Sequence, residues 1–234
     1  FDSKGNTQKG ISILESAYEK ALSTKSYVAD EELILTLNNL CASFLNIENY
    51  EKANFYSNIL ESTFLKYSNS IDNNSLVEKY NKKINSSHQK YLMHLLKDYL
   101  NNVSIIKYFV GEYSNSINML ELLHQADPNG NSIIDGRYNL FKGKNLVALN
   151  RLDEAEIEFY RLIKNGTNYK DQAYFYLGDI YIKKGDNVIA IGFFKHSCEL
   201  GNSNSCENVK FLSQNKTYSE IKNSDDAINF LKSK

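Results

Sequence analysis

Apolar positions recur at intervals of three and four residues along most of the chain. Between Ala173 and Lys184 they follow the spacing of one helical face: Tyr176, Leu177, Ile180 and Tyr181. The pattern stops at Gly185, a residue that tolerates the left-handed backbone of a helix end, and resumes over 188–194. We therefore predict two helices of roughly twelve residues, joined by a tight turn and packed antiparallel.

The same two-helix unit recurs along the chain. A small residue marks the corresponding place in the second helix of each unit: Ala53, Ser116, Ala155 and Ala190. The last two are 35 residues apart, and Ser116 lies 39 residues before Ala155. A period in the mid-thirties is typical of helical repeat arrays. We expect the units to stack on one another, because no single helix pair can bury its own apolar face.

The unit that shows the pattern most clearly contains, in order, Tyr174, Leu177, Gly178, Tyr181, Ala190 and Phe194. This order and spacing resemble the tetratricopeptide repeat family, and other units keep parts of it, with Cys41 at a position where the family usually has glycine. The resemblance implies an all-α fold, a right-handed superhelical array of antiparallel helix pairs. In it, Gly178 and Ala190 allow close approach of the helix backbones, while Tyr181 and Phe194 fill the space between repeats.

We predict a single helical-repeat domain over 1–234. It should begin with an unpaired helix (11–22) that corresponds to the second helix of a repeat. The parts that follow are a repeat (34–67), an irregular insertion with a helix (68–96), three repeats (97–130, 136–170 and 171–205) and C-terminal capping helices (206–234). The capping region should close with a helix over 224–231. A long helix should run from about Ser87 to Phe109. The insertion before it is either an exposed excursion of the chain or a flap that reaches a partner.

Composition and charge argue against several classes of protein. The chain of 234 residues has one proline and 11 glycines, too few turn residues for a many-stranded sandwich or barrel. Its formal net charge of −1 argues against nucleic-acid binding, which usually depends on a basic excess. The sequence also lacks an apolar run of the roughly 18 residues that a transmembrane helix requires. The chain begins with Phe1, as expected of a trimmed or mature form, so a missing signal peptide carries no information about export.

Motifs typical of catalysis or cofactor binding do not occur in the sequence. The histidines lack metalloprotease spacing, and there is no nucleophile elbow, P-loop or dinucleotide fingerprint. Residues 127–131 superficially resemble a calcium loop, but Tyr138 stands where a closing glutamate is needed, so we predict a turn between repeats. Glu154 and Glu156 lie in a stretch of mixed charge, which indicates a solvated helix face. We predict no enzyme, no metal and no cofactor.

Three cysteines are present: Cys41, Cys198 and Cys206. The segment that contains the last two is similar to cysteine-rich members of the Sel1-like repeat family, and this character is confined to 171–212. That resemblance implies a Cys198–Cys206 disulfide, worth about 2–3 kcal/mol, and an oxidising compartment. Two small buried thiols in a reduced cytosolic protein remain the alternative. We expect Cys41 to fill a small packing site as a free thiol.

The first helix of each repeat lines the concave surface of such an array. The helical register predicts that one set of side chains faces this groove: Asn101, Ile105, Tyr108, Phe109, Arg137, Leu140, Lys144, Val147, Phe175, Asp179, Ile182 and Lys183. A mixture of aromatic, aliphatic and charged groups suits an amphipathic helix or an extended peptide. The carboxylate-binding set that some members of the family use is not reproduced here.

We therefore predict a scaffold that binds a protein or peptide partner in this groove. The Sel1-like character favours a role in assembling or localising a bacterial envelope complex, such as a pilus or secretion apparatus. The expected location is the periplasm or the outer membrane, with the cytoplasm as the alternative. A regulatory module that senses a peptide is the alternative function. A hydrolase, as proposed for the cysteine-rich relatives, has no supporting residue, and the pattern does not predict an oligomeric state.

Overall fold

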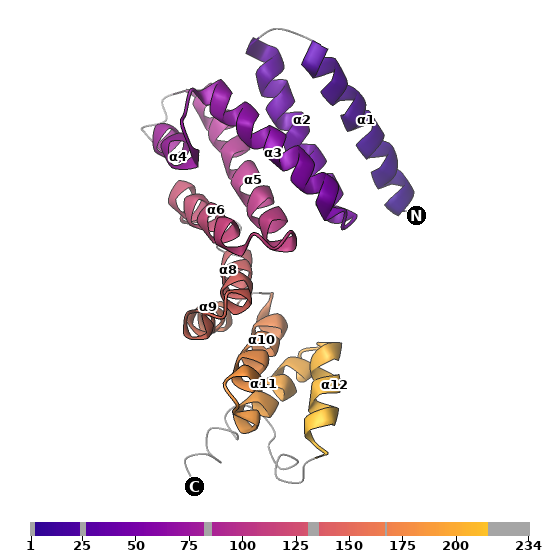
Figure 1. Cartoon of the computed structure of the whole chain (residues 1–234), viewed down its shortest axis with the longest axis vertical. Coiled ribbons are helices and arrows are strands. Elements are labelled where there is room, and N and C mark those ends of the chain that lie inside the picture. The colour runs from indigo at the N-terminus through magenta and orange to yellow at the C-terminus, as the bar shows by residue number, and fades with distance from the viewer. Residues whose placement is uncertain (1–2, 24–26, 82–85, 131–135, 167, 215–234) are drawn as a thin grey trace. The chain divides into compact units, whose positions relative to one another are not determined.

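A computed structural model describes residues 3–23, 27–81, 86–130, 136–166 and 168–214 (Figure 1). Every regular element in these ranges is an α-helix, which confirms the predicted all-α class. The chain divides into two compact units, Phe1–Pro128 and Asn129–Lys234, which we describe separately. The right-handed superhelix and the single domain over 1–234 remain predictions.

The first unit contains α1 (Ser3–Ser23), α2 (Tyr27–Asn46), α3 (Tyr50–Ser68), α4 (Asn73–Asn81), α5 (Ser87–Phe109) and α6 (Tyr113–Ala126). The helices α1, α2, α3 and α5 lie side by side, and α6 packs on α5 (Figure 1). Helix α5 has the bounds that its pattern predicts. Helix α1 begins earlier than expected and packs on α2, because Ile11, Leu14 and Tyr18 place one apolar stripe against the core.

The insertion at 68–96 is less exposed than expected. Leu76 and Val77 of α4 are buried in the core of the unit. The Asn73 side chain accepts a hydrogen bond from Tyr99 of α5 (2.8 Å) and donates one to Glu61 of α3 (2.6 Å). Helix α4 is therefore fixed to both neighbouring helices, and its apolar face is part of the core.

The second unit contains α8 (Arg137–Ala148), α9 (Leu152–Lys164), α10 (Lys170–Lys183), α11 (Asn187–Glu199) and α12 (Ser203–Leu212). The pairs α8–α9 and α10–α11 each pack together, while α10 also contacts α9 and α12 packs on α11. Gly185 ends α10 in a left-handed conformation (φ 81°), as its position predicts. The closing helix expected over 224–231 lies outside the described residues.

The contacts between small and large residues hold each helix pair together. All four small residues that mark the repeats are fully buried. A Cβ atom added at Gly178 would lie 2.6 Å from the Phe194 ring, and one added at Gly143 would lie 2.7 Å from the Phe159 ring. The Phe194 ring therefore packs within the α10–α11 pair, and it also faces residues of α12, the helix that follows this pair.

Candidate functional site

The groove residues predicted in the first unit all lie on α5. Asn101, Ile105 and Tyr108 are half-buried, whereas Phe109 is 40% exposed. The Phe109 ring stacks on Tyr50 of α3, with centroids 4.1 Å apart and planes 6° from parallel. Phe109 therefore packs against a neighbouring helix, although part of its ring remains open to solvent.

In the second unit the structure contradicts the prediction that Leu140 faces a groove. Leu140 is only 3% exposed and belongs to the interior, because α9 and α10 both pack on α8 and cover more than one of its faces. Arg137 and Val147 on the same helix are half-buried, and Lys183 at the end of α10 is exposed. The remaining predicted residues lie on α8 and α10, which contact each other.

Lys144 of α8 lies over aromatic rings. Its Nζ atom is 4.9 Å from the centroid of Phe141 and 5.8 Å from that of Tyr176 on α10, and such cation–π contacts are attractive. Burial lowers the pKa of Lys144. The Phe175 ring contacts Tyr176 and Phe194, with centroids 5.3 Å and 5.9 Å away. Both predicted groove residues therefore also contribute to packing.

A pocket of about 240 Å³ lies between α10, α11 and α12. Its lining combines two predicted groove residues with four others: Asp179, Ile182, Phe194, Asn208, Phe211 and Leu212. The sequence reasoning missed the α12 wall, since it assigned 206–234 to capping helices. The sequence offered no signal for this wall beyond the aromatic Phe211 itself, which the structure shows to be 72% exposed. Monomeric proteins expose single apolar residues often, but apolar groups gathered at a pocket indicate a binding site.

Asp179 is the charged group of this pocket. Burial raises the pKa of its carboxyl to about 6, although the charge of Lys183, one helical turn away, acts in the opposite direction. Among the described residues, no hydrogen bond or ion pair to the Asp179 side chain is found. The same holds for the side-chain amide of Asn208 on the facing helix. Within the described part of the chain, the pocket therefore presents two polar side chains that make no hydrogen bond.

Asp179→Asn is expected to raise the melting temperature at pH 7 by roughly 2–4 °C, the shift that about 1 kcal/mol gives in a chain of this size. The unfolded carboxyl has an ordinary pKa of about 4, and folding raises it to about 6. Between these values the unfolded chain loses its proton first, so the stability of the wild type falls as the pH rises. Solvent screening keeps the expected shift modest.

Melting curves from pH 4 to 8 test this expectation. The difference between Asp179→Asn and wild type should be near zero at pH 4, grow to about pH 6 and then stay constant. The contrasting variant is Glu158→Gln, which should lower the melting temperature because Glu158 binds Asn139 (2.7 Å) and Arg161 (2.9 Å). A difference for Asp179→Asn that is equal at every pH would assign the effect to packing.

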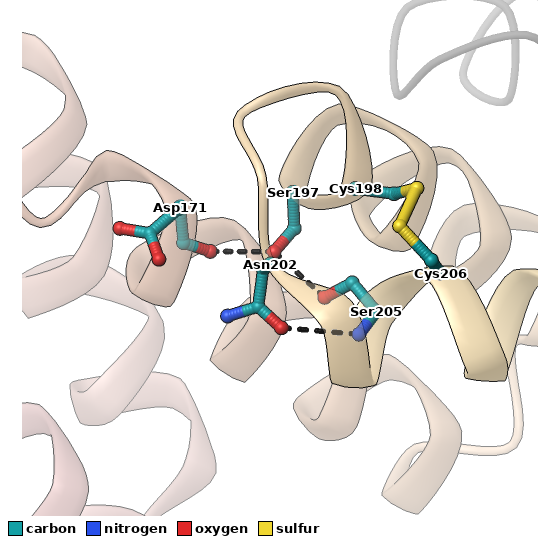
Figure 2. Close-up of a disulfide and its surroundings, with 6 residues drawn as sticks. All are labelled: Asp171, Ser197, Cys198, Asn202, Ser205 and Cys206. Carbon is teal, nitrogen blue, oxygen red and sulfur yellow. Dashed lines mark hydrogen bonds between the residues drawn. A yellow bond between two sulfur atoms is a disulfide. The ribbon is translucent and has the colours of Figure 1, made fainter.

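Helix α12, which forms one wall of the pocket, is joined to α11 by a disulfide between Cys198 and Cys206 (Figure 2). A hydrogen-bonded chain runs beside this bond. The Ser205 hydroxyl donates to the Ser197 hydroxyl (2.7 Å), which donates to the backbone oxygen of Asp171 in α10 (2.6 Å). Asn202 caps α12 by accepting a hydrogen bond from the Ser205 backbone N–H (3.0 Å). Covalent and polar contacts therefore hold α12 beside the rest of the pocket.

The described ranges show neither a membrane-spanning helix nor a cluster of metal ligands. No helix there is both long and apolar enough to cross a bilayer. No three histidine, cysteine, aspartate or glutamate side chains in the same ranges are grouped so that they could hold a metal ion.

Comparisons with known proteins give little beyond this geometry. No family model and no curated protein matches the chain. Among solved structures, the TPR2AB domain of yeast Sti1, in a complex with pHSP90, is similar over 96% of this chain and 99% of that chain. The sequence identity is 13% and the TM-score is 0.38. The description of the fold as packed helix pairs therefore rests on the structure itself.

Proposed function

We propose that this chain is a helical-repeat scaffold that binds a peptide or helix of a partner protein, and that the pocket between α10, α11 and α12 holds one side chain of that partner. The observation that carries the proposal is the lining of this pocket. It combines polar side chains on two helices, which make no hydrogen bond to any described residue, with apolar side chains that remain exposed. Protein interfaces commonly concentrate their binding energy where an anchoring side chain enters such a pocket.

The binding surface extends onto α8 in this proposal. Lys144 lies over the Tyr176 ring, so α8 and α10 together present a cation and aromatic faces. An amphipathic helix or extended peptide would contact such a mixed surface at several points along its length. In the alternative proposal, a peptide-sensing regulatory module, a short free peptide would occupy the same pocket.

We further propose an extracytoplasmic location and a role in assembling or localising a bacterial envelope complex, such as a pilus or secretion apparatus. The Cys198–Cys206 disulfide supports the location, because disulfides persist mainly in oxidising compartments. The role itself rests on the Sel1-like character of the sequence around these cysteines.

Site-specific photocrosslinking in the organism of origin tests the scaffold. The crosslinking amino acid p-benzoylphenylalanine replaces Phe211 in the pocket or, as a matched control, Phe55 of α3, which is 58% exposed. We expect one or two stoichiometric partners at position 211 that are not captured at position 55. Addition of Asp179→Lys, which places a cation in the pocket, should reduce the yield at 211.

The outcome that would contradict the scaffold is a well-folded protein that gives the same products at both positions, or no protein product at position 211. Equal crosslinking yields at position 211 with and without Asp179→Lys would show that the partner does not bind through the pocket. A melting shift with a short peptide, in the absence of any crosslinked protein, would favour the peptide-sensing module.

A further inference from the structure

The pocket between α10, α11 and α12 is polar at some points of its lining and apolar at others. Ile182 and Leu212 supply aliphatic surface, and Phe194 and Phe211 supply aromatic rings. Asp179 from α10 and Asn208 from α12 supply the polar groups. At about 240 Å³ the pocket is smaller than most sites for whole small-molecule ligands, which occupy roughly 300–1,000 Å³. Its size therefore suits one long side chain.

The surroundings of Asp179 differ from those of Glu158, a buried carboxylate with a structural role. Glu158, which is 4% exposed, accepts hydrogen bonds from Asn139 and Arg161 and pairs with Lys142 at 3.3 Å. In the described structure Asp179 has no such donor, and an ionised carboxylate can only accept hydrogen bonds. A half-buried charge without a partner costs free energy. A ligand that supplies a donor with positive charge would remove this cost.

Other occupants fit this lining less well. An anionic side chain would be repelled by Asp179, and an apolar one would bury the carboxylate without a partner. A lysine or arginine side chain can lay its methylene groups along Ile182 and Leu212 while its charged head reaches Asp179. The exposed Phe211 ring would then add a cation–π contact, and Asn208 could accept a hydrogen bond.

We propose that this pocket recognises a lysine or arginine side chain of the partner, through the Asp179 carboxylate at its polar side. The inference rests on the proposed function and adds the chemical class of the side chain that enters the pocket. Lys183 is the nearby competitor, since it lies one helical turn from Asp179 and influences its carboxyl. Its exposed position leaves it free to turn away into solvent.

The test uses the full chain labelled with ¹⁵N and three pentapeptides as probes. Each peptide has the form Ac-Ala-Leu-X-Leu-Ala-NH₂, with lysine, norleucine or glutamate at X. Backbone amide shifts of Asp179, Asn208 and Phe211 report binding at the pocket. We expect the lysine peptide to bind roughly ten-fold more tightly than the norleucine peptide, and the glutamate peptide to bind more weakly than either.

Variants connect this preference to the carboxylate. Asp179→Asn should remove the roughly ten-fold preference for lysine over norleucine, whereas Asp98→Asn, the same change on α5 in the first unit, should leave it intact. Phe211→Ala alters an exposed side chain and should weaken binding of the lysine peptide without unfolding the chain. It therefore tests the pocket even if Asp179→Asn fails to fold. Lys183→Ala should strengthen lysine binding, because a competing cation is removed.

The outcomes separate this inference from the scaffold proposal. Equal binding of the lysine and norleucine peptides, or an unchanged lysine preference in Asp179→Asn, would overturn cation recognition, while photocrosslinking at Phe211 could still support the scaffold. Contacts in the free protein between the pocket and residues 215–234 would identify the chain's own segment as the occupant, which would overturn recognition of a partner side chain. If no peptide binds and no partner is crosslinked, the proposed function itself is overturned.

Discussion

Gly178→Ala is expected to destabilise the α10–α11 pair by about 1–3 kcal/mol, the usual cost of adding a methyl group to a packed interior. A Cβ atom at this position would lie 2.6 Å from the Phe194 ring, which is 1% exposed, so either the ring or the helices must shift to admit it. In an open helical position the same change should stabilise, because alanine favours the helix over glycine.

Gly10 provides the matched control for this expectation. It lies inside α1, and an added Cβ atom would meet no atom within 4 Å, so Gly10→Ala should stabilise the first unit by about 0.5–1 kcal/mol. The physical reason is tested by adding Phe194→Leu to Gly178→Ala. The double variant should lose less stability than the sum of the two single losses, because a smaller side chain relieves the clash.

Urea unfolding followed by circular dichroism measures these differences, and hydrogen exchange of the α10 and α11 amides assigns them to the helix pair. Additive losses in the double variant would show that the ring of Phe194 is not the cause. A neutral Gly178→Ala would show that the helices can separate without cost.

Removal of the Cys198–Cys206 disulfide is expected to lower the stability of the second unit by about 2–3 kcal/mol, as the entropy of closing a loop with this short separation predicts. The loss should concentrate in α12, whose described contacts with the other helices of the unit are chiefly with α11. Because Asn208 and Phe211 lie on α12, the lysine peptide should also bind more weakly.

The double variant Cys198→Ala with Cys206→Ala and the reduced wild-type protein should behave alike in hydrogen exchange, with faster exchange in α12. Cys41→Ala provides the matched control, since it changes a buried free cysteine of the first unit. Unchanged protection of α12 would mean that the hydrogen bonds through Ser197 and Ser205 hold the helix without the disulfide.

Thiol alkylation followed by intact-mass measurement establishes the starting state of that experiment. In denaturant without reductant, we expect one labelled cysteine, Cys41. In the folded protein we expect none, because burial encloses the Cys41 thiol and raises its pKa to about 12. Three labels in denaturant would exclude the disulfide and remove the support for an extracytoplasmic location.

The local pattern of the sequence predicted α5 closely, although α1 begins at Ser3 and not at 11. The turn at Gly185 and the bounds of α5 follow from the apolar period and the residues that interrupt it. The burial of Ala53, Ser116, Ala155 and Ala190 also follows, because a recurrent small residue marks a place where helices approach closely. The turn and the helix bounds depend on neighbours within about one or two helical turns, and the small-residue contacts depend on the adjacent helix of the same pair, which the repeat pattern already indicates.

The candidate site depended on neighbours that are distant in the sequence. The helical period shows that Leu140 lies near one face of α8, but the packing of α10 decides that this face is covered. The helical period also places Asp179 on α10. The pocket forms only because Asn208 and Phe211 of α12 pack beside it, and this packing buries the carboxylate. The sequence alone therefore determined the bounds of α5, the turn at Gly185 and the small-residue contacts. Only the tertiary structure decided which side chains share a pocket, because burial and charge depend on the elements that surround a group.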